Sequence, residues 1–104
     1  MVEETDEINI KIKQFIEKAK KKYRITRAYL YGSFSKGTAT KWSDIDLAII
    51  SPDFSDDTLE DRISLMRISS SIDDRLEPHP FSISRFNATD PLVYEICQNG
   101  IRII

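Results

Sequence analysis

Residues 28–51 of the 104-residue chain read AYLYGSFSKGTATKWSDIDLAIIS, and this stretch decides the fold. Two β-prone runs, 28–31 and 44–50, enclose a Gly-Ser turn and a short irregular segment. Because residues two apart in a strand point to the same face, Asp44 and Asp46 would project side by side. The isoleucine and leucine residues that alternate with them would point the opposite way, into a core.

Two adjacent carboxylates indicate a cation site. Like charges on Asp44 and Asp46 repel each other, and removing them from water is unfavourable. A positive group should therefore lie between them, and a hard divalent cation such as Mg²⁺ is the usual one.

The turn after the first run supplies what such a cation works with. Gly32 permits a positive φ angle and a close approach to the backbone. Backbone N–H groups at this turn, together with the hydroxyl of Ser33, can hold phosphate oxygens. Lys36 adds positive charge nearby, and Gly37 adds a second flexible point. A phosphate-binding turn beside two carboxylates is typical of phosphoryl or nucleotidyl transfer.

Gly32-Ser33, ten intervening residues and then Asp44-Ile45-Asp46 form a motif. It resembles the signature of the DNA polymerase β-type nucleotidyltransferase superfamily. The nearest resemblance is to the minimal nucleotidyltransferase family, whose small prokaryotic members are often paired with a HEPN-domain protein. It covers most of the chain and implies an α/β fold: a small mixed sheet with helices packed mainly on one side. Residues 1–104 would form a single domain.

A third carboxylate is expected from a strand beside the Asp-x-Asp strand, because members of the superfamily carry one there. Glu77 lies on the β-like run 75–84 and is the preferred residue. Asp73 and Asp74 compete with it, but they lie at a predicted helix end, where a turn role is more natural. His79 follows Glu77 on the same face; a catalytic role and a structural role both stay open.

The resemblance assigns roles to these residues. Asp44, Asp46 and Glu77 would be catalytic and would hold two Mg²⁺ ions, while Gly32, Ser33 and Lys36 would bind the nucleotide. The implied reaction moves AMP from ATP onto a hydroxyl.

The rest of the chain alternates predicted helices and strands. Apolar residues at helical spacing predict an N-terminal helix that covers the sheet and a second helix over 59–72, largely buried. The run 75–84 contains two prolines and is predicted as an edge or distorted strand. A last helix begins near Asp90-Pro91, and 101–104 is a short terminal strand. Trp42 and Cys97 are interpreted as packing residues.

Composition restricts the class of protein. The net charge of −2 and pI near 5.4 argue against a dedicated nucleic-acid binder. The single cysteine points to a reducing cytoplasm. The sequence holds no apolar run of about 20 residues, so no membrane span is expected.

The length of the chain leaves little room for an acceptor-binding domain, so the acceptor is expected on another molecule. The resemblance implies an antitoxin that transfers AMP from ATP onto a tyrosine of a HEPN ribonuclease toxin. One alternative is a catalytically weak nucleotide-binding antitoxin that neutralises its partner by binding alone. Another is an enzyme that modifies a small molecule, as antibiotic nucleotidyltransferases do.

Overall fold

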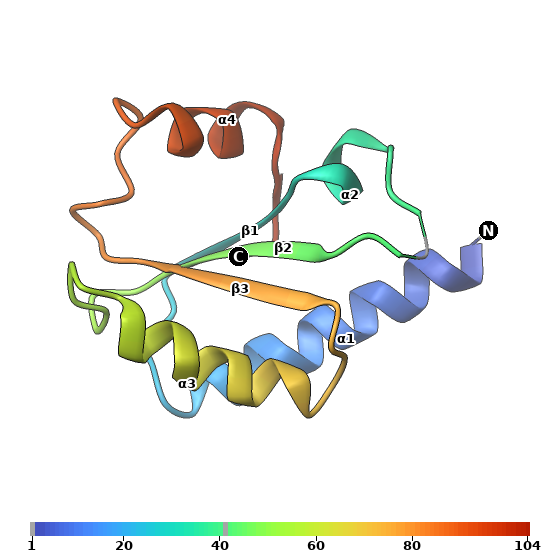
Figure 1. Cartoon of the computed structure of the whole chain (residues 1–104), viewed down its shortest axis with the longest axis horizontal. Helices are drawn as coiled ribbons and strands as arrows, with labels where there is room; N and C mark the ends of the chain where they lie inside the picture. Colours follow the sequence, from blue (N-terminus) through green and yellow to red (C-terminus); the bar gives the residue numbers. More distant parts are fainter. Residues whose placement is uncertain (1, 41) are drawn as a thin grey trace.

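The computed structural model describes residues 2–40 and 42–104, which form alternating helices and strands (Figure 1). The elements in chain order are α1 (Val2–Lys20), β1 (Arg27–Tyr31), α2 (Ser33–Lys36), β2 (Ile45–Ile50), α3 (Leu59–Ser70), β3 (Leu76–Phe81), α4 (Pro91–Asn99) and β4 (Ile101–Arg102). Within these residues, no helix has both the length and the apolar character that crossing a bilayer requires.

The strands form one mixed sheet in the order β3-β2-β1-β4. β1 pairs antiparallel with β2 and β4, whereas β2 and β3 are parallel and are joined through α3. β3 is an edge strand, as its prolines predicted. The carbonyls of Arg75 and Phe81 accept hydrogen bonds from the β2 side. Because backbone groups alternate along a strand, Pro78 and Pro80 face the open edge, where a missing N–H breaks no pairing.

One face of the sheet carries the larger core. α1 and α3 lie on this face, below the sheet in Figure 1. The buried side chains of α1 form one apolar stripe from Ile8 to Ala19, as the helical spacing predicted. The buried residues of this core are Ile8, Ile12, Phe15, Ile16, Ala19, Ile25, Ala28, Leu30, Ile45, Leu47, Ile49, Phe54, Leu65 and Leu76.

The opposite face carries a smaller core beneath α4. Asp90 caps this helix by accepting a hydrogen bond from the N–H of Leu92 at 2.8 Å, and Pro91 occupies its first turn, as predicted. Buried residues of α4, of the sheet and of the loop between β3 and α4 meet here: Tyr29, Ala48, Ile50, Phe86, Val93 and Ile96. The expectation of helices mainly on one side therefore holds for the two longest helices, with α4 on the other face.

Three burial predictions are wrong. Trp42 is 80% exposed, and Cys97 lies on the exposed side of α4. α3 was expected to be largely buried, but only Leu65 and Ser69 are buried along it. This helix packs against the sheet along a narrow line, so Ile68 is only partly buried and Leu59, Ile63 and Met66 are exposed.

Candidate active site: a carboxylate cluster beneath a glycine turn

The predicted site residues meet at one end of the sheet. β1 ends there at Tyr31, while β2 and β3 begin there. The register places Tyr31 opposite Asp46 and Asp46 opposite Glu77, so these three residues form a row across three strands. Asp44 was predicted to lie in this strand, but β2 begins one residue later, at Ile45.

The acidic side chains converge. Donor atoms of Asp46, Glu77 and His79 all lie within 4.8 Å of one another. The Nε2 atom of His79 is 3.5 Å from Asp46 Oδ1 and 3.8 Å from Glu77 Oε1. Asp44 is close enough to Glu77 for a hydrogen bond between the two carboxyl groups. The structure therefore brings Asp44, Asp46 and Glu77 together, and it adds His79 to them.

Crowding of negative charge changes the ionisation of the cluster. Burial raises the pKa of Glu77, and the hydrogen bond and charge of Asp44 and the charge of Asp46 raise it further. Burial lowers the pKa of His79, although the carboxylate of Asp46 opposes this. Burial also raises the pKa of Tyr31 to about 12, assisted by the charge of Asp46. The cluster thus favours a bound positive charge.

Gly32 lies directly against the carboxylate of Asp46. Its φ of 75° and ψ of −148° lie in a region that only glycine occupies readily. A Cβ atom at this position would lie 2.5 Å from Asp46 Oδ2, so the turn rests directly on that carboxylate. The Gly32 carbonyl accepts hydrogen bonds from the N–H groups of Ser35 and Lys36. These bonds form α2, a short helix where the sequence predicted an irregular segment.

The other predicted residues are placed as follows. Lys36 ends α2, and its Nζ is 3.4 Å from Glu95 Oε2 on α4. Asp73 forms ion pairs with Lys11 at 2.8 Å and with Arg75 at 3.1 Å, which hold its pKa well below the usual range. Its carboxylate is thus engaged at the junction of α3 and β3. Of the three competitors for a third carboxylate, Glu77 is the one in the cluster.

Two residues that sequence reasoning did not assign to the site also act on it. Tyr31 packs its ring against His79, with ring centroids 5.9 Å apart. Its position directly before Gly32 was an available signal. Arg62 of α3 influences the ionisation of Tyr31, Glu77 and His79 through its positive charge. No sequence motif identifies Arg62, because its distance from the cluster depends on how α3 packs against β3.

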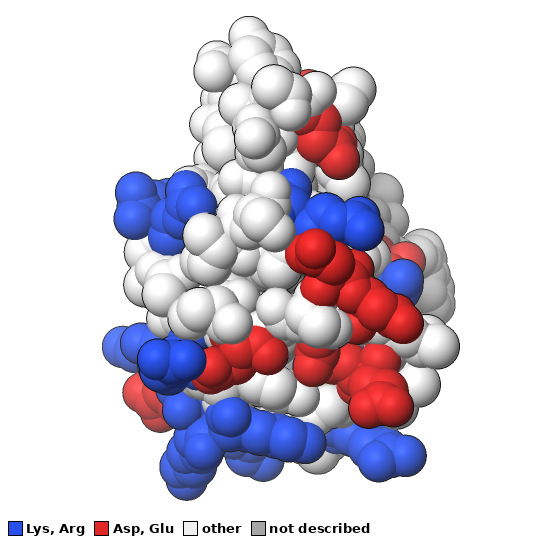
Figure 2. All heavy atoms as spheres, turned by 90° about the vertical axis from the view of Figure 1, so that its left-hand side faces the viewer, with Lys and Arg blue, Asp and Glu red and all other residues white. Residues whose placement is uncertain are grey.

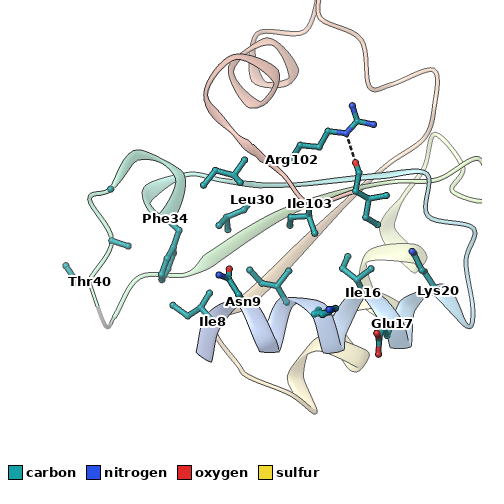
Figure 3. A pocket seen from close by; sticks show the side chains of 16 residues that line it. Ile8, Asn9, Ile16, Glu17, Lys20, Leu30, Phe34, Thr40, Arg102 and Ile103 are labelled. Atoms are coloured by element: carbon teal, nitrogen blue, oxygen red, sulfur yellow. Dashed lines mark hydrogen bonds between the residues drawn. The ribbon is translucent and has the colours of Figure 1, made fainter. Parts of the chain in front are cut away.

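Two further surface features lie apart from this cluster. The face shown in Figure 2 carries groups of Asp and Glu side chains among groups of Lys and Arg, and it is not uniformly basic. A hollow of about 820 Å³ lies between α1 and the C-terminal segment and is lined by residues such as Ile8, Phe34 and Ile103 (Figure 3). Arg102 is among the lining residues, and its Nε donates a hydrogen bond to the Ile104 carbonyl. None of the four cluster residues lines the hollow.

Comparisons with known proteins agree with this arrangement. The family described as polymerase beta, nucleotidyltransferase matches residues 11–104, and the chain belongs to this family. No curated protein sequence gives a significant match.

Two solved structures share the fold. One, a toxin–antitoxin structure with AMP-PNP, has 24% identity and a TM-score of 0.61, over 88% of this chain and 68% of that one. The other, assigned as a nucleotidyltransferase from Sulfolobus solfataricus, has 16% identity and a TM-score of 0.59, over 92% and 84% of the two chains.

Proposed function

We propose that this chain is a magnesium-dependent nucleotidyltransferase that moves AMP from ATP onto a hydroxyl of a partner protein, with residues 1–104 acting as one domain. The observation that carries the proposal is the position of Gly32 directly over Asp46, with Glu77 and Asp44 beside it. Membership of the nucleotidyltransferase family supports the reaction class.

The ligand types at the site suit magnesium. Carboxylate oxygens are the ligands that Mg²⁺ prefers, and Asp44, Asp46 and Glu77 would hold two such ions. When bound, the ions would neutralise phosphate charge and lower the pKa of the acceptor hydroxyl. Burial raises the pKa of Glu77, the charges of Asp44 and Asp46 raise it further, and a bound cation would relieve the repulsion among these carboxylates.

The turn above the carboxylates would orient the nucleotide. The first N–H groups of a helical turn have no partner within the helix, so those at the start of α2 can donate to phosphate oxygens. Gly32 and Ser33 would hold the β- and γ-phosphates. Lys36 would contribute charge from the end of the same turn, where Glu95 now pairs with it.

The reaction itself is an in-line displacement. The acceptor oxygen forms a bond to the α-phosphorus of ATP, the bond from this phosphorus to the bridging oxygen breaks, and pyrophosphate leaves. If Glu77 does not ligate an ion, its carboxylate would instead accept the hydroxyl proton as general base. Alignment and charge neutralisation would provide most of the rate enhancement.

The partner is proposed to be a HEPN-family toxin in the cytoplasm. This assignment rests on the family resemblance and on a structural neighbour that is a toxin–antitoxin structure with AMP-PNP, an adenine nucleotide. In this proposal the acceptor is a tyrosine hydroxyl of the toxin, and its modification silences the ribonuclease.

The test is transfer of label from ATP labelled on its α-phosphate, with Mg²⁺, onto a HEPN-family protein encoded beside this chain. We expect labelled partner with the native protein and none with the Asp44→Asn/Asp46→Asn double variant. The matched control is Asp57→Asn, which removes an exposed carboxylate outside the cluster and should leave labelling unchanged.

Labelling by a folded double variant would contradict the active-site assignment. A tight complex that silences the toxin without label would support the alternative antitoxin, which acts by binding alone. Label on a small molecule but not on protein would contradict the proposed acceptor.

A further inference from the structure

The imidazole of His79 is the part of the cluster that the proposed reaction leaves unexplained. Its Nε2 atom faces two carboxylates at once, Asp46 at 3.5 Å and Glu77 at 3.8 Å. Both separations are too long for a strong hydrogen bond. Donors that share one metal ion at about 2 Å lie roughly 3–4 Å from one another, which matches both separations.

The backbone holds this imidazole in a fixed place. His79 lies between Pro78 and Pro80, whose rings fix their φ angles, and a residue before proline is restricted to extended conformations. Its side chain is only 24% exposed and packs against the ring of Tyr31. The nitrogen donor is therefore oriented in advance, as a metal ligand must be.

We propose that His79, Asp46 and Glu77 form one mixed nitrogen and oxygen ligand set that binds Mn²⁺ more tightly than Mg²⁺. Imidazole suits transition-metal ions, whereas Mg²⁺ takes oxygen ligands almost exclusively. The inference rests on the site of the proposed function and deepens it, because it gives one of the proposed ion positions a nitrogen ligand and a metal preference.

The measurement is Mn²⁺ binding without nucleotide or partner, using protein purified without a histidine tag. Loss of the free Mn²⁺ signal in electron paramagnetic resonance gives the affinity, and pulsed measurements detect nitrogen coupled to the bound ion. The chain contains one histidine, so imidazole coupling can arise only from His79. We expect this coupling in the native protein.

Variants separate ligation from a general effect of charge. His79→Gln should abolish the nitrogen coupling and weaken Mn²⁺ binding by about tenfold or more, while Mg²⁺ binding, measured by competition, falls by less than about threefold. Asp46→Asn should weaken both ions. Asp57→Asn should change neither, because its carboxylate lies outside the cluster.

Absence of imidazole coupling in the native protein would overturn the proposal, and this result does not depend on whether any variant folds. Equal loss of Mn²⁺ and Mg²⁺ affinity in His79→Gln would also overturn it, because His79 would then only position the carboxylates of Asp46 and Glu77.

Failure of the proposed function is distinguishable from failure of the ligand set. Imidazole coupling without AMP transfer would support the ligand set and contradict the transferase. AMP transfer without imidazole coupling would support the transferase and contradict the ligand set.

Discussion

The two faces of the central strand β2 perform different tasks with alternating residues. On the α1 and α3 side, Ile45, Leu47 and Ile49 are completely buried in the larger core. On the opposite side, Asp46 is the first residue of that face and lies next to solvent, whereas Ala48 and Ile50 join the smaller core beneath α4. The larger core thus lies on one face, and the carboxylate cluster lies at one end of the other.

This difference explains how a small chain accommodates a crowded acidic cluster. Repulsion among carboxylates destabilises the folded state, and burial increases that repulsion. Asp46 and Glu77 keep 28% and 37% of their side chains exposed, whereas the core behind them excludes water. Changes on the two faces should therefore separate loss of activity from loss of stability.

Asp46→Asn is expected to give the largest loss of activity without loss of stability. The substitution keeps the shape beneath Gly32 but removes the charge at the centre of the cluster. We expect AMP transfer to fall about a thousandfold or more, equivalent to about 4 kcal/mol of transition-state stabilisation. The free energy of unfolding should stay the same or rise, because repulsion with Glu77 is relieved. Initial transfer rates and urea unfolding measure the two effects, and a strongly destabilised variant would contradict the separation.

Leu47→Ala should give the opposite result. Leu47 is completely buried on the core face, one residue after Asp46. Removing its side chain leaves a cavity and should lower the free energy of unfolding by about 3 kcal/mol. Below the unfolding temperature, the transfer rate per folded molecule should change much less than in Asp46→Asn. Urea unfolding with parallel rate measurements checks this, and equal losses of rate in the two variants would show that the faces are not independent.

Gly32 and Gly37 share a positive φ angle, but only Gly32 contacts the carboxylate cluster. Gly32→Ala combines backbone strain with a Cβ atom 2.5 Å from Asp46 Oδ2, and we expect about 2 kcal/mol of destabilisation and strongly reduced transfer. Gly37→Ala is the matched control, because Gly37 has the same φ of 75° but nothing lies within 4 Å of its added Cβ. It should lose about 1 kcal/mol, from the left-handed backbone conformation alone, and retain activity. Thermal unfolding and rates distinguish them; similar loss of transfer in both would mean that the contact with Asp46 is unimportant.

Alternation along a strand is a strong local signal, and it identified most of this arrangement. The alternation of residues 44–50 predicted a strand with an apolar face toward the core, which is confirmed; of the two aspartates predicted on its other face, only Asp46 belongs to the strand. The edge position of β3 followed from Pro78 and Pro80, because proline lacks a backbone donor. Both predictions depend only on neighbouring residues.

The features that sequence reasoning missed depend on how distant elements pack. Leu59, Ile63 and Met66 share a helical stripe but remain exposed, because periodicity does not say which of two adjacent apolar stripes faces the sheet. Periodicity likewise did not show which side of α4 is buried, so Cys97 was predicted in the core although it is exposed. The contact of His79 with Asp46 depends on the parallel register of β2 and β3, which local sequence does not specify.

The smallest predicted effect concerns Asp73, the acidic residue outside the cluster that joins α1 to the start of β3. Its carboxylate is mostly buried and pairs with Lys11 and Arg75. Asp73→Asn should lower the free energy of unfolding by about 1–2 kcal/mol at pH 7 and leave AMP transfer nearly unchanged.

The effect of pH on stability distinguishes this interaction from the carboxylate cluster. The pKa of Asp73 is lower in the folded state than in the unfolded chain, so its stabilising contribution is complete above the unfolded value of about 4. The contribution decreases as the pH falls from about 4 toward the depressed folded value. The difference in unfolding free energy between native protein and Asp73→Asn should therefore shrink between pH 5 and pH 3, as urea unfolding at a series of pH values would measure. A constant difference across this range would mean that the substitution acts through packing alone, and the polar link between α1 and β3 would contribute nothing to the stability of the core face.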